Sequence, residues 1–284
     1  MATQTQIDKK VGTTTAPGVL GLIAGEGKLP AILARSAKNR GWRVVALALS
    51  EMAAGRLEGT CDKVYEVAPG QIGRSMKLLK SESVDSAVFI GKVPKLNILK
   101  NIHKFDWTAV KELSKLPDFS DDTIQFRVGD LTEEHGVKVL TQSEFLRDLF
   151  PDYGIITKRQ PSAGEYADIE YGMRIAKEVA RLDIGQTVVV KNQMLMSVEA
   201  IEGTDEAIKR AVKLARGPVV VCKVAKPNQD QRFDIPTVGM NTLESMINEK
   251  GGGVLAIEAQ ETLVVEREEM AQFADANGMS IIAV

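Results

Sequence analysis

The chain has 284 residues, of which 44% are hydrophobic and 26% are charged, so it can bury a core and has room for two domains. Its 36 Lys and Arg residues against 38 Asp and Glu residues give a formal net charge of −2, which argues against a dedicated nucleic-acid binder. No run approaches the roughly 20 apolar residues of a membrane helix. Residues 1–17 are polar and lack the apolar core of a signal peptide. We therefore expect a cytoplasmic two-domain protein that follows a polar tail.

Cysteine and histidine are scarce. Cys61 and Cys222 lie far apart, which is typical of a reducing compartment rather than of a disulfide-stabilised fold. With only His103 and His135 beside them, a zinc site of thiolate and imidazole ligands is not expected.

Residues 18–150 alternate short apolar runs with helical patterns, which predicts parallel strands in a doubly wound sheet. The expected strands are Val19–Ala24, Arg43–Leu49, Asp62–Val67, Asp85–Ile90 and Val137–Leu140, and the expected helices are Leu29–Asn39, Ile72–Leu79 and Asp121–His135.

Prolines and glycines interrupt the pattern in residues 151–163, where we place an inter-domain linker and the candidate hinge for closure around a ligand. Residues 164–284 then read as a second α/β domain with a mixed sheet. Its elements are a helix at Asp168–Ala180, one hairpin of Thr187–Lys191 with Met194–Ala200, a second hairpin of Gly253–Glu258 with Thr262–Glu266, and strands at Val219–Val224 and Ser280–Val284.

A glycine-containing loop, Gly25, Glu26 and Gly27, joins the first strand to the first helix. Such a loop lets backbone N–H groups approach a phosphate at the helix N-terminus, although a plain strand-to-helix turn needs the same glycines. It is an incomplete dinucleotide fingerprint, because Pro30 stands where a third glycine belongs.

Gly91 and Lys92 follow a second parallel strand. Because ligands gather at the carboxyl ends of such strands, we expect Gly25 and Gly91 to line one crevice, with Lys92 toward a phosphate or else simply solvated.

An amphipathic pattern in Pro94–Phe105 has a lysine-bearing face. It suits an ordinary helix on the sheet, or contact with acyl chains or a membrane surface.

The densest polar segment runs from Lys223 to Gly239 and leads into a helix that Asn241 would cap. Its lysines, arginine and aspartates suit a charged phosphate and a divalent cation. Upstream, a strand ends at Glu199 and turns through Thr204 and Asp205 into another helix, where simple capping explains these two residues equally well.

Five segments together resemble the I-type UDP-2,3-diacylglucosamine pyrophosphatases of lipid A biosynthesis. They are Leu20–Gly25, Gly91–Val93, Leu182–Gln186, Glu199–Asp205 and Lys226–Thr237. The resemblance covers nearly everything from Val19 onward. It implies a Rossmann-like N-terminal domain, a distinctive α/β C-terminal domain, and a Mg²⁺-dependent hydrolase that binds its nucleotide-sugar lipid between them and releases UMP and 2,3-diacylglucosamine 1-phosphate.

The resemblance also implies roles for residues. Asp234 falls on the catalytic aspartate of an Arg-x-Asp-x-Pro motif and would hold Mg²⁺ or orient the attacking water, and Lys226 would act beside it. The expected substrate-binding residues are Gly25, Glu26, Gly27, Gly91, Lys92, Gln186, Thr204, Asp205, Lys223 and Gln229. Glu26 departs from the glycine expected there, and its carboxylate would repel a diphosphate or touch a sugar hydroxyl.

Two other functions remain open at this stage. An NAD(P)-linked oxidoreductase would use the Gly25 loop with Glu51 for a ribose, and a non-catalytic sensor of nucleotide sugars would use the same cleft. The expected partners are a lipid-linked UDP-sugar and, transiently, the inner-membrane surface. The sequence leaves a homodimer open.

Overall fold

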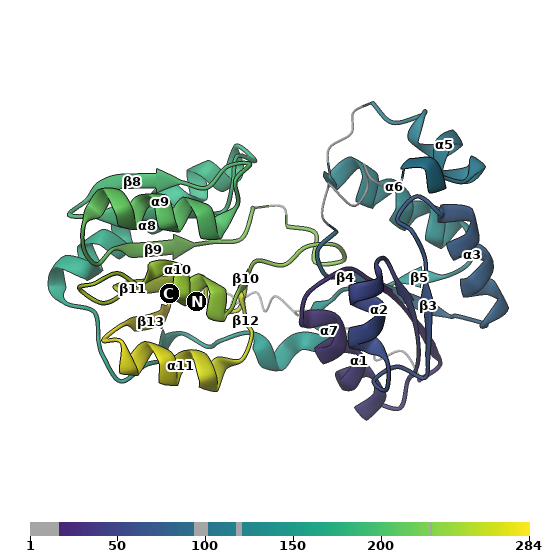
Figure 1. Ribbon diagram of the computed structural model, residues 1–284, viewed down its shortest axis with the longest axis horizontal. Coiled ribbons are helices and arrows are strands. Elements are labelled where there is room, and N and C mark those ends of the chain that lie inside the picture. Colours follow the sequence, from purple (N-terminus) through teal and green to yellow (C-terminus); the bar gives the residue numbers. More distant parts are fainter. Residues whose placement is uncertain (1–16, 94–101, 118–120, 228) are drawn as a thin grey trace, which may run out of the picture.

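The computed structural model describes residues 17–93, 102–117, 121–227 and 229–284, and these fold into two α/β domains that lie side by side (Figure 1). The expected fold class, with a parallel N-terminal sheet and a mixed C-terminal sheet, is confirmed. Most of the amphipathic pattern at Pro94–Phe105 lies outside the described residues, which include a single 3₁₀ turn there, Ile102–Lys104.

The N-terminal sheet has the order β3-β2-β1-β4-β5, and all its strands are parallel. The strands are β1 (Val19–Ala24), β2 (Arg43–Ala48), β3 (Lys63–Glu66), β4 (Ser86–Ile90) and β5 (Lys138–Val139). The helices are α1 (Leu29–Asn39), α2 (Glu51–Leu57), α3 (Ile72–Ser81), α5 (Trp107–Leu113), α6 (Asp121–Glu134) and α7 (Ser143–Leu146).

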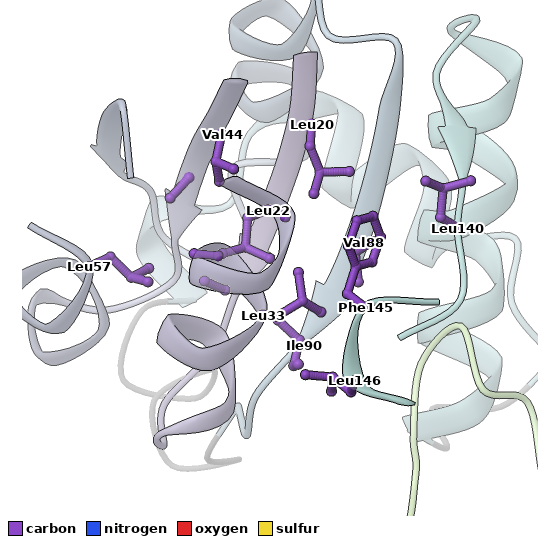
Figure 2. Close-up of a cluster of buried hydrophobic side chains, with 14 of the residues drawn as sticks. Leu20, Leu22, Leu33, Val44, Leu57, Val88, Ile90, Leu140, Phe145 and Leu146 are labelled. Atoms are coloured by element: carbon purple, nitrogen blue, oxygen red, sulfur yellow. The ribbon is translucent and has the colours of Figure 1, made fainter. Parts of the chain in front are cut away.

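Alternate residues of the N-terminal strands face two apolar layers, as the period of two in a strand requires. Leu20 and Leu22 of β1 pack with Leu33 of α1 and Phe145 of α7 on one face (Figure 2). Ile23 and other side chains of the opposite face pack against α3. Helices therefore cover both faces of this sheet.

The C-terminal sheet has the order β6-β13-β11-β9-β7-β8, and β10 pairs with β12 in a separate two-stranded sheet. The strands are β6 (Gly154–Ile155), β7 (Thr187–Lys191), β8 (Met194–Val198), β9 (Val220–Lys223), β10 (Thr237–Val238), β11 (Val254–Ile257), β12 (Leu263–Val264) and β13 (Ser280–Ala283). Helix α8 (Ala163–Arg181) covers one face of the sheet. Helices α9 (Thr204–Ala215), α10 (Met240–Met246) and α11 (Arg267–Ala276) cover the other.

One expected hairpin forms and the other does not. β7 and β8 are antiparallel around Asn192 and Gln193, which have φ angles of 51° and 55°. The prediction of the second hairpin is wrong. β11 instead pairs in parallel with β9 and β13, and β12 pairs in parallel with β10, because residues between β11 and β12 carry the chain out of the main sheet. The segment expected as a linker includes β6, which pairs with β13.

Two helix caps differ from expectation. α10 begins at Met240 after Gly239, so Asn241 lies inside the helix and caps nothing. α9 begins at Thr204 after Gly203, whose φ of 83° suits glycine, so the Thr204 hydroxyl is free for a different contact.

A segment that we call the bridging loop, residues 224–227 and 229–236 between β9 and β10, reaches from the C-terminal domain to the N-terminal domain (Figure 1). Its Ile235 is buried in the core of the N-terminal domain. Leu263, which also belongs to the C-terminal half of the chain, is buried in the same core. The two domains therefore share apolar packing at the place where the polar residues gather.

Candidate functional site

Two loops meet at the carboxyl ends of the neighbouring strands β1 and β4. The Glu26 N–H donates to the Lys92 carbonyl at 2.7 Å, and the Lys92 N–H donates back to the Glu26 carbonyl at 2.9 Å. Glycine is required on both sides. A Cβ at residue 25 would lie 2.5 Å from the Lys92 carbonyl oxygen, and Gly91 has a φ of 94°. The structure thus brings Gly25, Glu26, Gly91 and Lys92 to one edge.

This edge also determines which amides a phosphate could reach. The Gly25 N–H donates to the Ile90 carbonyl at 2.8 Å, and the Glu26 N–H is bonded to Lys92, so both amides are occupied. Gly27 is exposed, has a φ of 110°, and stands just before α1. Lys28 pairs with Glu266 of the C-terminal half at 2.6 Å. The backbone groups that this loop could offer to an anion are therefore those at the N-terminus of α1.

The C-terminal domain contributes a buried ammonium group. Lys223, at the end of β9, is 7% exposed and donates to the Thr204 hydroxyl at 3.0 Å and to the Thr187 hydroxyl at 3.3 Å. Thr204 in turn donates to Glu199 Oε1 at 2.7 Å. Hydrogen bonds thus connect Lys223 to Glu199 through Thr204, which gives the threonine a role other than capping.

Burial and neighbouring charge compete within this network. Burial lowers the pKa of Lys223, the Glu199 and Asp234 carboxylates oppose this, and the Lys92 ammonium lowers the pKa further. Burial raises the pKa of Glu199, but the Lys223 ammonium and hydrogen bonds from threonines outweigh it and leave that pKa below its usual value. Since Lys92 belongs to the other domain, cations from both domains act on one region.

Asp234 lies in the bridging loop with its carboxylate exposed. Gln229 Nε2 donates to Asp234 Oδ2 at 3.0 Å, and Gln186 Nε2 makes a longer contact with the same oxygen at 3.4 Å. Within the described residues, Oδ1 of Asp234 has no hydrogen-bond partner. The carboxylate is therefore held through one oxygen and presents the other to solvent.

Gln186 reaches this point because Gly185 lets the chain pass close to the end of β8. A Cβ at residue 185 would lie 2.2 Å from the Glu199 carbonyl oxygen. The side-chain oxygen of Gln186 is buried and has no hydrogen-bond partner within the described residues.

Lys226 and Asp205 are placed less centrally. Lys226 Nζ pairs with Asp183 at 2.6 Å, and the Lys226 N–H donates to Gln229 Oε1 at 3.1 Å. Asp205 acts on Lys223 only through its charge. A hollow of about 310 Å³ opens beside the bridging loop and is lined by Lys177, Ala225, Lys226, Pro227, Gln229, Gln231, Glu258 and Glu261.

The sequence did not single out the residues that hold the bridging loop in place. Gln142 Nε2 donates to the carbonyls of Phe89 at 2.9 Å and Phe233 at 3.0 Å. The Phe233 ring lies 5.3 Å from that of Phe89 and 5.5 Å from that of Phe126, centroid to centroid. A glutamine after a short strand only weakly indicates a buried anchoring residue. The packing of aromatic residues that lie far apart in the chain leaves no recognisable pattern in the sequence.

In the part of the chain that the structure describes, no three carboxylate, imidazole or thiolate groups converge as a ready metal site. None of the described helices is long and apolar enough to cross a membrane.

Comparison with known families accounts for both domains. Residues 19–149 match the LpxI N-terminal domain, and residues 152–282 match the LpxI C-terminal domain. The chain belongs to the LpxI family. This LpxI-family chain is 31% identical over 283 residues to the UDP-2,3-diacylglucosamine pyrophosphatase LpxI of Caulobacter vibrioides (strain ATCC 19089 / CIP 103742 / CB 15), covering 93% of this chain and 97% of that protein.

Solved structures add only a distant likeness. N5-carboxyaminoimidazole synthetase from Staphylococcus aureus, complexed with ADP, is 16% identical, with 61% of this chain and 38% of that chain covered and a TM-score of 0.22. The ADP complex of an N5-carboxyaminoimidazole ribonucleotide synthetase is 15% identical, with 69% and 45% covered and a TM-score of 0.25. Likeness at this level carries no argument about the LpxI-family site.

Gly25→Ala should separate the two loops, because the new methyl group would displace the Lys92 carbonyl. We expect faster hydrogen–deuterium exchange in peptides that cover residues 24–28 and 88–93, with no change in the β7–β8 hairpin. Gly55→Ala is the matched control, since a Cβ there meets nothing within 4 Å. Equal exchange in the Gly25→Ala variant and the control would show that the loops do not depend on this contact.

Proposed function

We infer that this chain hydrolyses the pyrophosphate bond of UDP-2,3-diacylglucosamine to UMP and 2,3-diacylglucosamine 1-phosphate in lipid A biosynthesis. Membership of the LpxI family over both domains supports the substrate and the reaction. The structural observation that carries the chemistry is the Asp234 carboxylate, which has one oxygen open to solvent within electrostatic range of the buried Lys223.

The diphosphate would lie between the two domains. Lys92 on one side and Lys223 on the other supply positive charge, and their mutual repulsion makes a dianionic group between them favourable. The backbone at Gly27 can meet a phosphate at the N-terminus of α1. Because Gly91 has no side chain, the Lys92 loop can lie directly against the Gly25 loop. Glu26 would then contact a sugar hydroxyl rather than a phosphate oxygen.

Each residue of the site would have a separate role in an in-line displacement at phosphorus. Asp234 would orient a water molecule through its open oxygen and accept a proton from that water as it attacks. Lys223 would stabilise the charge that builds on the phosphoryl oxygens, and its burial strengthens this interaction because little water screens it. Gln229 and Gln186 hold the carboxylate in position. Lys226 would break its ion pair with Asp183 and then contact the phosphoryl oxygens. Thr204 and Asp205 would help to keep Lys223 in place.

We propose Mg²⁺ as the cofactor, and the donor set is compatible with it. Mg²⁺ in phosphoryl-transfer sites takes one or two carboxylates and completes its shell with phosphate oxygens and water. Asp234, whose exposed carboxylate is hydrogen-bonded through Oδ2 only among the described residues, would supply a carboxylate oxygen. When bound, the ion would neutralise charge on the diphosphate.

The two other candidate functions lack such support. Glu51, which an oxidoreductase would use for a ribose, begins α2 beside a separate hollow of about 400 Å³ that Ser50 and Arg74 also line. That arrangement gives the polar network around Asp234 no role. A sensor of nucleotide sugars would use the same cleft without turnover, and loss of turnover on changing Asp234 distinguishes it from a hydrolase.

We also propose transient contact with a membrane surface, because a sugar that carries two acyl chains resides in a bilayer. The described residues contain no membrane-spanning helix, so such contact would be made from the surface.

Asp234→Asn should lower kcat by at least about 100-fold with KM changed only a few-fold, because the amide keeps the shape but loses the charge that acts in the transition state. Release of UMP in the presence of Mg²⁺ is the measurement. Glu261→Gln, an exposed carboxylate on the rim of the 310 Å³ hollow, is the matched control and should stay close to the wild-type rate. Near-wild-type turnover by Asp234→Asn would exclude the assigned role.

The position of Asp234 and Lys223 in the C-terminal domain leads us to place the sugar-side phosphate there, with the uridine end toward the Gly25 loop. Attack on the sugar-side phosphorus expels UMP, and both possible attacks give the same products. Hydrolysis in ¹⁸O-water should therefore place the label in 2,3-diacylglucosamine 1-phosphate. Label in UMP would reverse the proposed orientation.

A further inference from the structure

An exposed tryptophan marks the outer end of the N-terminal domain. Trp107, the first residue of α5, is 80% exposed, and Val110, one turn along the same helix, is 47% exposed. Tryptophan is usually largely buried, and the other tryptophan of this chain, Trp42, is 7% exposed. Figure 1 shows α5 at the top of the N-terminal domain, above α3. We take this exposed apolar pair as a candidate interaction surface.

The opposite side of α5 is firmly held, so the exposure of Trp107 does not come from a loose helix. Ala109 is fully buried. Glu112 pairs with Arg127 of α6 at 2.7 Å and with Lys115 at 2.8 Å. The Lys115 and Arg127 hydrogen bonds lower the pKa of Glu112 to about 2, so these pairs persist at neutral pH. Trp107 is therefore presented outward by a helix anchored on its inner face.

Lysines lie on α3, on α5 and just before α5. Gly73 of α3 faces Thr108 of α5, and Lys77 and Lys80 follow Gly73 by four and seven residues, so they continue the same face of α3 away from that contact. Lys111 follows Trp107 by one helical turn.

Lys104 adds a fourth cation just before α5. All four lysines are exposed, and among the described residues none of them is paired with a carboxylate. We call the set the α5 surface: Lys77, Lys80, Lys104, Trp107, Val110 and Lys111.

We propose that the α5 surface docks the protein on a bilayer that contains anionic phospholipids. Tryptophan favours the boundary between headgroups and acyl chains, and lysines beside it are attracted by the negative surface potential of such a membrane. In a chain of net charge −2, four unpaired lysines near an apolar pair are a local concentration that suits a negatively charged, partly apolar partner. The inference rests on the membrane contact proposed above and is independent of the hydrolytic chemistry.

Binding of the full chain to phosphatidylcholine vesicles with and without phosphatidylglycerol tests the proposal. We expect binding only where phosphatidylglycerol is present, weakening with added salt, together with a blue shift of the tryptophan emission. Trp107→Ser should abolish the shift, because Trp42 is already buried. The double variant Lys77→Glu/Lys111→Glu should lower the vesicle partition coefficient at least about tenfold.

Lys158→Glu/Lys213→Glu is the matched control, since it changes the net charge equally at exposed sites in the C-terminal domain. It should bind vesicles within about twofold of the wild type. Equal loss in both double variants, or wild-type binding by the Lys77→Glu/Lys111→Glu variant, would overturn the assignment of the α5 surface while leaving membrane contact in place. Failure of the wild type to bind any vesicle, or binding of nucleic acid in preference to vesicles, would overturn both. Turnover of detergent-dispersed substrate by the same variants reports on hydrolysis separately.

Discussion

The packing of Phe233 against Phe89 and Phe126 is the contact on which the rest of the site depends. Phe233 belongs to the C-terminal half, yet its ring is held by the N-terminal domain at centroid distances of 5.3 and 5.5 Å. Gln142 fixes the backbone at the same place by donating to the Phe233 carbonyl. Asp234 is the next residue along the chain. The backbone that carries its carboxylate is therefore anchored by the N-terminal domain, whereas Gln186 and the ammonium of Lys223 belong to the C-terminal domain.

The buried network beneath Asp234 gives that arrangement its electrostatic character. An ammonium group as deeply buried as Lys223 is unfavourable on its own, which is why its pKa is lowered by burial. Hydrogen bonds to Thr187 and Thr204, and the charge of Glu199, keep it in place. Lys92 adds repulsion from the opposite side. Under the proposed function, an anionic ligand with two phosphates would relieve this repulsion, so the site would be preorganised for the charge of its substrate rather than for its own stability.

The sequence was sufficient to predict those parts of the fold that depend on local patterns of residues. Alternating strands and helices predicted the parallel sheet, and Asn192 with Gln193 predicted the β7–β8 hairpin. The partners of β11 and β12 could not be read this way, because two short apolar runs separated by a turn look alike whether they pair with each other or with distant strands. The convergence of Gly25 and Gly91 followed from sheet topology. The anchor made by Gln142 and Phe233 did not, since contacts between residues so far apart leave no periodic signal.

A single methyl group added to the N-terminal domain tests most directly whether this anchor positions the proposed catalytic carboxylate, Asp234. Gly129 of α6 faces the Phe233 ring, and a Cβ there would lie 2.5 Å from its Cζ atom. We expect Gly129→Ala to lower kcat for UDP-2,3-diacylglucosamine at least about tenfold, because a displacement of roughly 1 Å in a catalytic group is costly, while the folded structure persists. Gly55→Ala, whose added Cβ meets nothing within 4 Å, should retain the wild-type kcat. A wild-type kcat in Gly129→Ala would contradict the dependence of Asp234 on the contact between the two domains.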